Sequence, residues 1–126
     1  VQCMQIILVS FGFSYGPIDA EYVVDLRFLQ NPYWEPALRP FPGTDARIAE
    51  YVLGNEQTQQ FLALYKPLLT FLCETWQKKG RDELKLALGC TGGRHRSVAV
   101  TEYLTKWLSE KGYSCHCVHR DIEAGQ

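Results

Sequence analysis

The sequence has no apolar stretch long enough to form a membrane helix. Its longest early apolar run, residues 6–9, is far shorter than the ~20 residues that a membrane span needs and shorter than the apolar region of a secretory signal. The sequence therefore predicts a soluble domain without membrane contact and with a cytoplasmic location.

Cysteine is present but forms no disulfide framework. The five cysteines stand at positions 3, 73, 90, 115 and 117, an odd number with irregular spacing, which favours reduced thiols. The pair Cys115-x-Cys117 lacks both the two-residue gap of common zinc knuckles and a second pair, so no metal is predicted. Cys3, Cys73, Cys115 and Cys117 are expected to be small core or surface residues.

Neither sign of charge is in excess. The chain has 13 lysines and arginines against 14 aspartates and glutamates, which gives a net charge of -1. Only a local basic cluster could therefore hold a polyanion. With 126 residues, 46% of them hydrophobic, the chain suits a single domain over residues 1–126 with one core.

Short aliphatic runs alternate with amphipathic segments along the chain. Strands are predicted over residues 6–11, 22–29, 84–88 and 113–119. Helices are predicted over residues 44–54 with Thr44 as N-cap, over residues 55–80, and between Ser97 and Gly112. This alternation indicates an α/β fold: a single three-layer domain with a small, largely parallel sheet flanked by helices.

The long helix and the loop before the first helix carry specific expectations. Pro67 is expected to kink or split the long helix. Four of the six prolines fall within residues 30–43, which predicts an ordered surface loop. The apolar stripe of the long helix is expected to pack in the core, with an oligomer face as the alternative. Its members are Phe61, Leu64, Tyr65, Leu68, Leu69, Leu72 and Trp76.

The most informative segment joins the third predicted strand to the third helix. Parallel sheets bind ligands at the carboxyl ends of their strands, where the following helix points unpaired N–H groups at an anion. Two adjacent glycines let the backbone approach closely, and an arginine offers a bidentate fork to a phosphate. The candidate ligands are Thr91, Gly92, Gly93, Arg94, His95, Arg96 and Ser97. The alternative is a tight turn whose arginines are only solvated.

The same turn lacks the second glycine and the Lys-Ser or Lys-Thr pair of a Walker A loop. It does match the Cys-x5-Arg-Ser/Thr loop of cysteine-dependent phosphatases. There Cys90 would be the nucleophile, Arg96 would bind the phosphate, and Asp25 or Glu35 would be the general acid. A glycine precedes Cys90 where these phosphatases usually carry a histidine.

Two further pairs of polar residues have two interpretations each. Asp25 and Arg27 lie two residues apart on a predicted strand and so point to the same side. They form either a surface ion pair, worth ~0 to 1 kcal/mol, or part of the ligand pocket. His119 and Arg120 end the last predicted strand, where they either border the same crevice or are solvated.

Seven motifs along the chain closely resemble the C-terminal domain of the RapZ/YvcJ family, and they occur in the same order as in that family. The most specific is residues 89–98, Gly-Cys-Thr-Gly-Gly-Arg-His-Arg-Ser-Val. The others are residues 10–13, 17–20, 24–29, 31–34, 38–40 and 119–120. The resemblance covers essentially the whole chain.

The resemblance implies a regulatory binding module rather than an enzyme. In this family a P-loop nucleotide-binding domain precedes the module, so nucleotide hydrolysis is not assigned to these 126 residues. The module is expected to sense glucosamine-6-phosphate or a similar phosphorylated amino sugar, to bind small regulatory RNA as an adaptor for RNase E, and to form homo-oligomers. No cofactor is expected.

The family pattern also implies individual roles. Thr91, Gly92, Gly93, Arg94, His95 and Arg96 would hold the phosphate. Asp25 and Arg27 would face the sugar, with Asn31 and Tyr33 nearby. Arg94 and Arg120 would contact RNA. Residues 121–126 are acidic to neutral where the family has a basic tail, so RNA binding is the weaker implication.

Overall fold

The computed structural model describes residues 4–124, which form a four-stranded sheet with strand order β2-β3-β1-β4. The strands are β1 (Gln5–Gly12), β2 (Tyr22–Asp25), β3 (Glu83–Cys90) and β4 (Ser114–His119). Every pair of neighbours is parallel. The two central strands are almost wholly buried, which explains their near-continuous apolar sequences, whereas the edge strands alternate in exposure.

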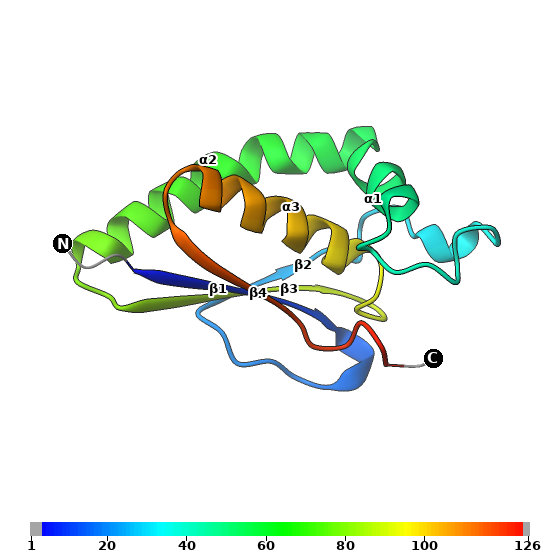
Figure 1. The fold of residues 1–126 in the computed structure, drawn as a ribbon, viewed down its shortest axis with the longest axis horizontal. Coiled ribbons are helices and arrows are strands. Elements are labelled where there is room, and N and C mark those ends of the chain that lie inside the picture. The colour runs from blue at the N-terminus through cyan, green and yellow to red at the C-terminus, as the bar shows by residue number, and fades with distance from the viewer. Residues whose placement is uncertain (1–3, 125–126) are drawn as a thin grey trace.

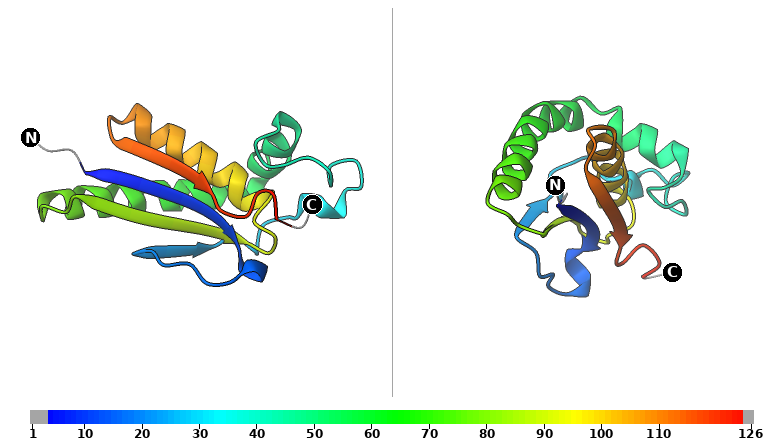
Figure 2. Two further views of the ribbon diagram at one scale, coloured as in Figure 1. Left: turned by 60° about the horizontal axis from the view of Figure 1, so that its bottom comes forward. Right: turned by 60° about the vertical axis from the view of Figure 1, so that its left-hand side comes forward.

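The helices α1 (Ala46–Leu53), α2 (Glu56–Lys78) and α3 (Arg96–Glu110) all lie on one face of the sheet (Figures 1 and 2). The predicted α/β class with a parallel sheet is confirmed. The third layer, on the opposite face, is the segment between β1 and β2, which contains only a short 3-10 helix, Phe13–Tyr15.

The strand order explains this one-sided cover. The connections from β2 to β3 and from β3 to β4 move across the sheet in the same direction, so right-handed crossovers place both on the same face. The connection from β1 to β2 moves in the reverse direction and must pass over the other face. The crossovers after β1 and β3 thus diverge where these neighbouring strands end, which is where such sheets form a ligand crevice.

A single core lies between the sheet and the helices. It is built from alternate residues of β1 and β3, such as Leu8 and Leu86, packed against Leu69 of α2 and Leu104 of α3. The opposite face is closed by aromatic packing, because the Phe11 and Phe13 rings meet edge to face with centroids 4.8 Å apart. Both faces of the central strands are therefore shielded from water.

Several predicted boundaries shift in the structure. The N-cap of α1 is Asp45 rather than Thr44, because the Asp45 carboxylate accepts the Arg47 N–H at 2.9 Å. The second strand ends at Asp25; the Leu26 N–H still donates to the Gly89 carbonyl of β3, and a turn follows at residues 27 and 28. Arg27 consequently lies beyond the strand.

Pro67 does not split the long helix. Helix α2 continues through it, and the neighbouring turns are held in place by the buried side chains of Leu62 and Leu69. The buried face of α2 is also rotated from the predicted stripe. It comprises Thr58, Leu62, Tyr65, Leu69 and Cys73. Leu64 and Leu68 are 78% and 50% exposed, so the prediction that they pack in the core is wrong.

Within residues 4–124, none of the helices combines the length and hydrophobicity that crossing a bilayer requires. Cys3, Gly125 and Gln126 lie outside the described residues.

Candidate functional site

The turn between β3 and α3 lies against the carboxyl end of β1. Gly93 adopts a left-handed conformation with φ of 72°, and a Cβ there would lie 2.4 Å from the Gly12 nitrogen. Gly93 therefore serves close packing against the protein's own strand. A Cβ at Gly92 would meet no atom within 4 Å, so Gly92 is the glycine that exposes backbone to a ligand.

A cavity of about 290 Å³ opens at this turn. Seven of the predicted ligand-binding residues line it: Asn31, Tyr33, Thr91, Gly92, Arg94, His95 and Arg96. Cys90 lines it as well, together with Tyr15 and Ala124, which the sequence did not single out. The lining contains no carboxylate among the described residues and includes two arginines, so the cavity has a positive character.

Arg96, the first residue of α3, is only 4% exposed. Its Nη1 donates to the carbonyl oxygens of Arg27 and Leu29 at 2.9 and 3.0 Å, and its Nη2 lies 3.4 Å from Thr91 Oγ1. Its Nε has no hydrogen-bond partner, and no carboxylate in residues 4–124 forms an ion pair with it. A buried guanidinium without a counter-charge costs several kcal/mol, so the site favours an incoming anion.

The N-cap residue of α3 contributes no capping side chain. His95 occupies the N-cap position without a side-chain cap hydrogen bond, and the first turn contains no acidic residue. The positive end of the helix dipole therefore adds to the charge of Arg96 at the cavity.

His95 is buried and its Nε2 has no hydrogen-bond partner. Burial lowers the pKa of His95 below its ordinary value, and the positive charges of Arg94 and Arg96 add to this effect, while backbone groups of Phe41 and Arg39 oppose it. His95 is thus neutral at neutral pH, when it can either donate or accept a hydrogen bond in the cavity.

Arg94 lines the cavity while bonding to the loops around it. Its Nη2 donates to the Pro40 carbonyl at 2.6 Å, and its Nη1 lies 3.5 Å from the Ile122 carbonyl. These bonds hold the proline-rich loop and the segment after β4 at the cavity mouth.

Asp25 and Arg27 pair with each other outside the cavity lining. Their carboxylate and guanidinium meet at 2.7 Å, both about half exposed, and the guanidinium also lies 4.1 Å from the Phe13 ring centroid. The hydrogen bond from Arg27 lowers the pKa of Asp25, and the charge of Arg96 contributes further. Asp25 is therefore ionised at neutral pH and unsuited to act as a general acid.

Cys90 and Ser97 contact each other behind the turn. The Cys90 Sγ lies 3.2 Å from Ser97 Oγ and 3.4 Å from the Ser97 N–H, which donates to it. Cys90 is 2% exposed and Ser97 is fully buried, so Ser97 does not reach the cavity lining.

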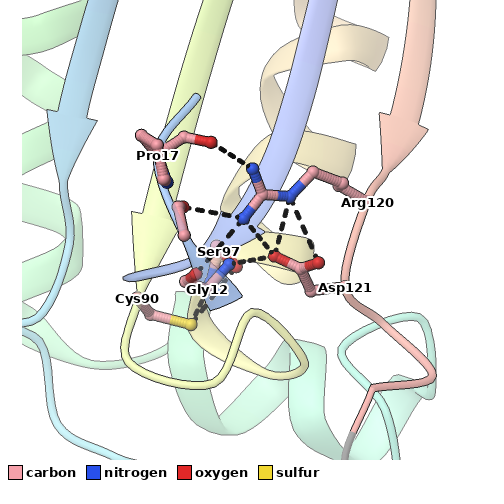
Figure 3. A network of polar contacts seen from close by, with 7 residues as sticks. Gly12, Pro17, Cys90, Ser97, Arg120 and Asp121 are labelled. Carbon is pink, nitrogen blue, oxygen red and sulfur yellow. Dashed lines mark hydrogen bonds and ion pairs between the residues drawn. The ribbon is translucent and has the colours of Figure 1, made fainter. Parts of the chain in front are cut away.

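Arg120 lies at the same end of the sheet and forms hydrogen bonds to the segment between β1 and β2 (Figure 3). Its Nη1 donates to the Pro17 carbonyl at 2.6 Å, its Nη2 to the Gly16 carbonyl at 3.0 Å, and its Nε to Asp121. Asp121 in turn accepts the Gly12 N–H at 2.8 Å. The structure thus gives Arg120 a role inside the protein, holding the segment between β1 and β2 to β4.

The sequence could have indicated Tyr15, which follows the motif at residues 10–13 and enters the cavity from the 3-10 helix. Ala124 carries no such signal, because an alanine has no chemistry to mark it. Of the predicted residues, Asp25, Arg27, Gly93 and Ser97 are the four outside the lining.

A fully parallel α/β domain has the architecture of a small-ligand-binding domain when a basic cavity, with no carboxylate in its described lining, lies at the crevice between diverging crossovers. The family model of the RapZ C-terminal domain matches residues 4–123, and the chain belongs to that family. The family assignment made from the sequence is confirmed.

Two curated relatives share one name. A "Nucleotide-binding protein" of Nocardioides sp. (strain ATCC BAA-499 / JS614) is 44% identical over 120 residues, which cover 94% of this chain and 40% of that protein. A "Nucleotide-binding protein" of Bacillus thuringiensis (strain Al Hakam) is 46% identical over 123 residues, 97% of this chain and 42% of that protein. The chain spans about two fifths of the length of these relatives.

Proposed function

We propose that this domain is a regulatory module that binds a phosphorylated amino sugar, such as glucosamine-6-phosphate, without converting it. Arg96 carries the proposal, because its guanidinium is buried and the described lining of the cavity contains no carboxylate. A phosphate in the cavity would supply the missing charge and accept the free Nε hydrogen.

The phosphate end of such a ligand finds several donors at once. Thr91 offers a hydroxyl, Gly92 an accessible backbone, and Arg94 and Arg96 their guanidinium groups. The start of α3, whose N-cap residue His95 makes no capping bond, adds its dipole.

The sugar end would meet neutral polar groups at the cavity mouth. Asn31, Tyr15 and Tyr33 can hydrogen-bond to sugar hydroxyls. Asp25 lies outside the lining but near enough to feel the charge of Arg96, and an ammonium group could compete with Arg27 for its carboxylate. This would distinguish an amino sugar from a plain sugar phosphate.

Isothermal titration calorimetry with glucosamine-6-phosphate tests the proposal. Binding is expected for the native protein, weaker binding for glucose-6-phosphate, and none for glucosamine, which lacks the phosphate. Arg96→Lys keeps the charge but loses the guanidinium fork, so affinity should fall about tenfold or more. Thermal unfolding of the variant would show that it is folded.

Arg47→Lys is the matched control. Arg47 lies on α1, where it pairs with Asp45 and does not line the cavity, so its replacement should leave the affinity unchanged. Absence of heat with native protein would contradict the proposal, as would equal affinity for the Arg96→Lys and native proteins. Tighter binding of ATP or inorganic phosphate would reassign the cavity to a different phosphate ligand.

A cysteine-dependent phosphatase is the second candidate, favoured by the contact between Cys90 and Ser97. In that chemistry the hydroxyl would stabilise the thiolate, and Arg96 would hold the phosphate. The candidate is weakened by the burial of Cys90 and by the lack of a carboxylate on the described cavity wall. Hydrolysis of an aryl phosphate that is lost in Cys90→Ser would support it, and inactivity of the native protein would exclude it.

Binding of small RNA and of RNase E remains part of the proposal through family membership. Arg94 supports it as a basic residue at the cavity, whereas Arg120 would have to bind RNA while holding its own internal bonds. RNA retention should weaken steeply with salt and on Arg94→Gln, as measured by gel shift. Retention that is insensitive to salt would contradict this part.

A further inference from the structure

A second cluster of chemically active side chains lies where α3 packs against β4 (Figure 1). Cys117 and His119 are two residues apart on β4 and so share one face of this edge strand. Glu102 reaches them from α3. One ligand atom from each of the three residues lies within 4.8 Å of the other two.

We propose that Glu102, Cys117 and His119 form a binding site for a divalent transition metal, with Zn²⁺ as the best-fitting ion. Thiolate, imidazole and carboxylate are the three ligand types that Zn²⁺ takes in proteins. Three protein ligands leave the fourth tetrahedral position open to water or to an external ligand. The proposal does not depend on the function of the cavity at Arg96.

The distance between Cys117 and His119 suits a tetrahedral ion. Bond lengths of about 2.3 Å to sulfur and about 2.05 Å to nitrogen place these two atoms about 3.5 Å apart across a tetrahedral angle. The Cys117 Sγ and His119 Nε2 are 3.5 Å apart. The Glu102 Oε1 is 2.7 Å from His119 Nε2 and would have to withdraw by roughly 0.6 Å. Its side chain, which is 49% exposed, has the freedom to do so.

Ser10 orients the imidazole for this role. Its Oγ lies 2.6 Å from His119 Nδ1, on the side of the ring opposite the cluster. When Nδ1–H donates to this hydroxyl, the Nε2 lone pair points toward Cys117 and Glu102. Metal-binding histidines are usually held in this way by a hydrogen bond from their second nitrogen.

The charge balance also favours a dication. A Cys117 thiolate and a Glu102 carboxylate together neutralise Zn²⁺ with a neutral His119, and the thiol proton leaves to solvent. The simpler alternative is a His119–Glu102 ion pair, which the 2.7 Å distance permits. In that alternative Cys117 is only a hydrogen-bonding neighbour of the ion pair, and the experiment distinguishes the two.

The prediction of no metal rested on Cys115 and Cys117, which do not have zinc-knuckle spacing. Cys115 and Cys117 do share a face of β4, but the partner ligands of Cys117 are a histidine on the same strand and a glutamate on a helix. Only the packing of α3 on β4 brings Glu102 to them.

The test measures Zn²⁺ affinity by competition with a chromogenic chelator, and thiolate ligation by the near-ultraviolet charge-transfer band of the Co²⁺-substituted protein. Native protein should bind one ion per chain and show the band. Cys117→Ser should lose the band and bind at least about tenfold more weakly, because even outer-shell changes cost that much. Glu102→Gln should bind more weakly but keep the band.

Cys115→Ser is the matched control, a neighbouring thiol on the same strand face that is outside the cluster. It should bind as the native protein does. The proposal is overturned if native protein fails to compete with the chelator, if Cys117→Ser binds as tightly as native protein, or if Cys115→Ser loses the band. Glu102→Gln changes an exposed helix position, so it keeps the test decisive even if Cys117→Ser is poorly folded.

Discussion

His95 shows how burial at a single residue links stability to pH. Its folded pKa lies below the ordinary 6.5, so as the pH falls the unfolded chain takes up a proton before the folded one does. The stability that a neutral His95 provides is therefore complete above about pH 6.5 and decreases below it. The free energy of unfolding, measured by urea denaturation, should be lower at about pH 5.5 than at about pH 7.5.

His95→Gln should flatten this dependence. His116→Gln is the control, because His116 is exposed on β4 and its replacement should leave the slope as it is in the native protein. A native protein equally stable at both pH values would contradict the account of His95.

Gly92 and Gly93 are adjacent, but only Gly93 is required to be glycine by its backbone conformation and its packing. Gly93→Ala should destabilise the fold by more than about 1 kcal/mol, because it combines a φ of 72° with a Cβ 2.4 Å from the Gly12 nitrogen. Gly92→Ala meets no atom within 4 Å and should unfold at nearly the native denaturant concentration while binding glucosamine-6-phosphate more weakly. Equal stability of both variants would contradict this separation.

Among the elements, α2 carries leucines of two kinds, some packed in the core and some exposed to solvent. Leu69 is fully buried and Leu64 is 78% exposed. Leu69→Ala should therefore cost about 2 to 5 kcal/mol of unfolding free energy, whereas Leu64→Ala should change it by about 0.5 kcal/mol or less. Chemical denaturation measures both, and similar losses would contradict the observed phase of the helix.

The elements also show what the sequence could determine. The apolar run of β1 and the alternating leucines of β3 identify strands because burial in a parallel sheet selects such residues locally. The phase of α2 could not be determined in this way, since the exposed Leu64 and Leu68 are as apolar as the residues that pack.

The residues of the candidate site also differ in whether the sequence could predict them. The contiguous ligands on the turn between β3 and α3 could be predicted, because strand, turn and helix are neighbours in sequence and their ends meet the crevice. The internal bonds of Arg120 and the approach of Glu102 to Cys117 depend on how α3 and β4 pack, which no local pattern encodes.

For the whole molecule, the exposed apolar stripe on α2 predicts self-association. Leu64, Leu68 and Phe71 are 78%, 50% and 62% exposed on successive turns, and such a patch favours a partner surface. Native protein is expected to sediment as a homo-oligomer in analytical ultracentrifugation. Leu64→Glu combined with Phe71→Glu should sediment as a smaller species.

Ala63→Glu is the control, an exposed position of α2 outside this stripe. It should leave the sedimentation unchanged. A native protein that sediments as a monomer, or a double variant that keeps the native size, would contradict self-association through α2.

The pairing of β1 with β4 joins the first and the last strand of residues 4–124. During synthesis, Ile6 and Leu8 are made long before Cys115 and Cys117, their partners in the register, have left the ribosome. Until then, the backbone N–H and C=O groups on one edge of β1 have no partner, and strands of other chains could pair with them. The domain therefore completes its sheet only after β4 has been synthesised, and a nascent chain stalled before β4 would depend on chaperones.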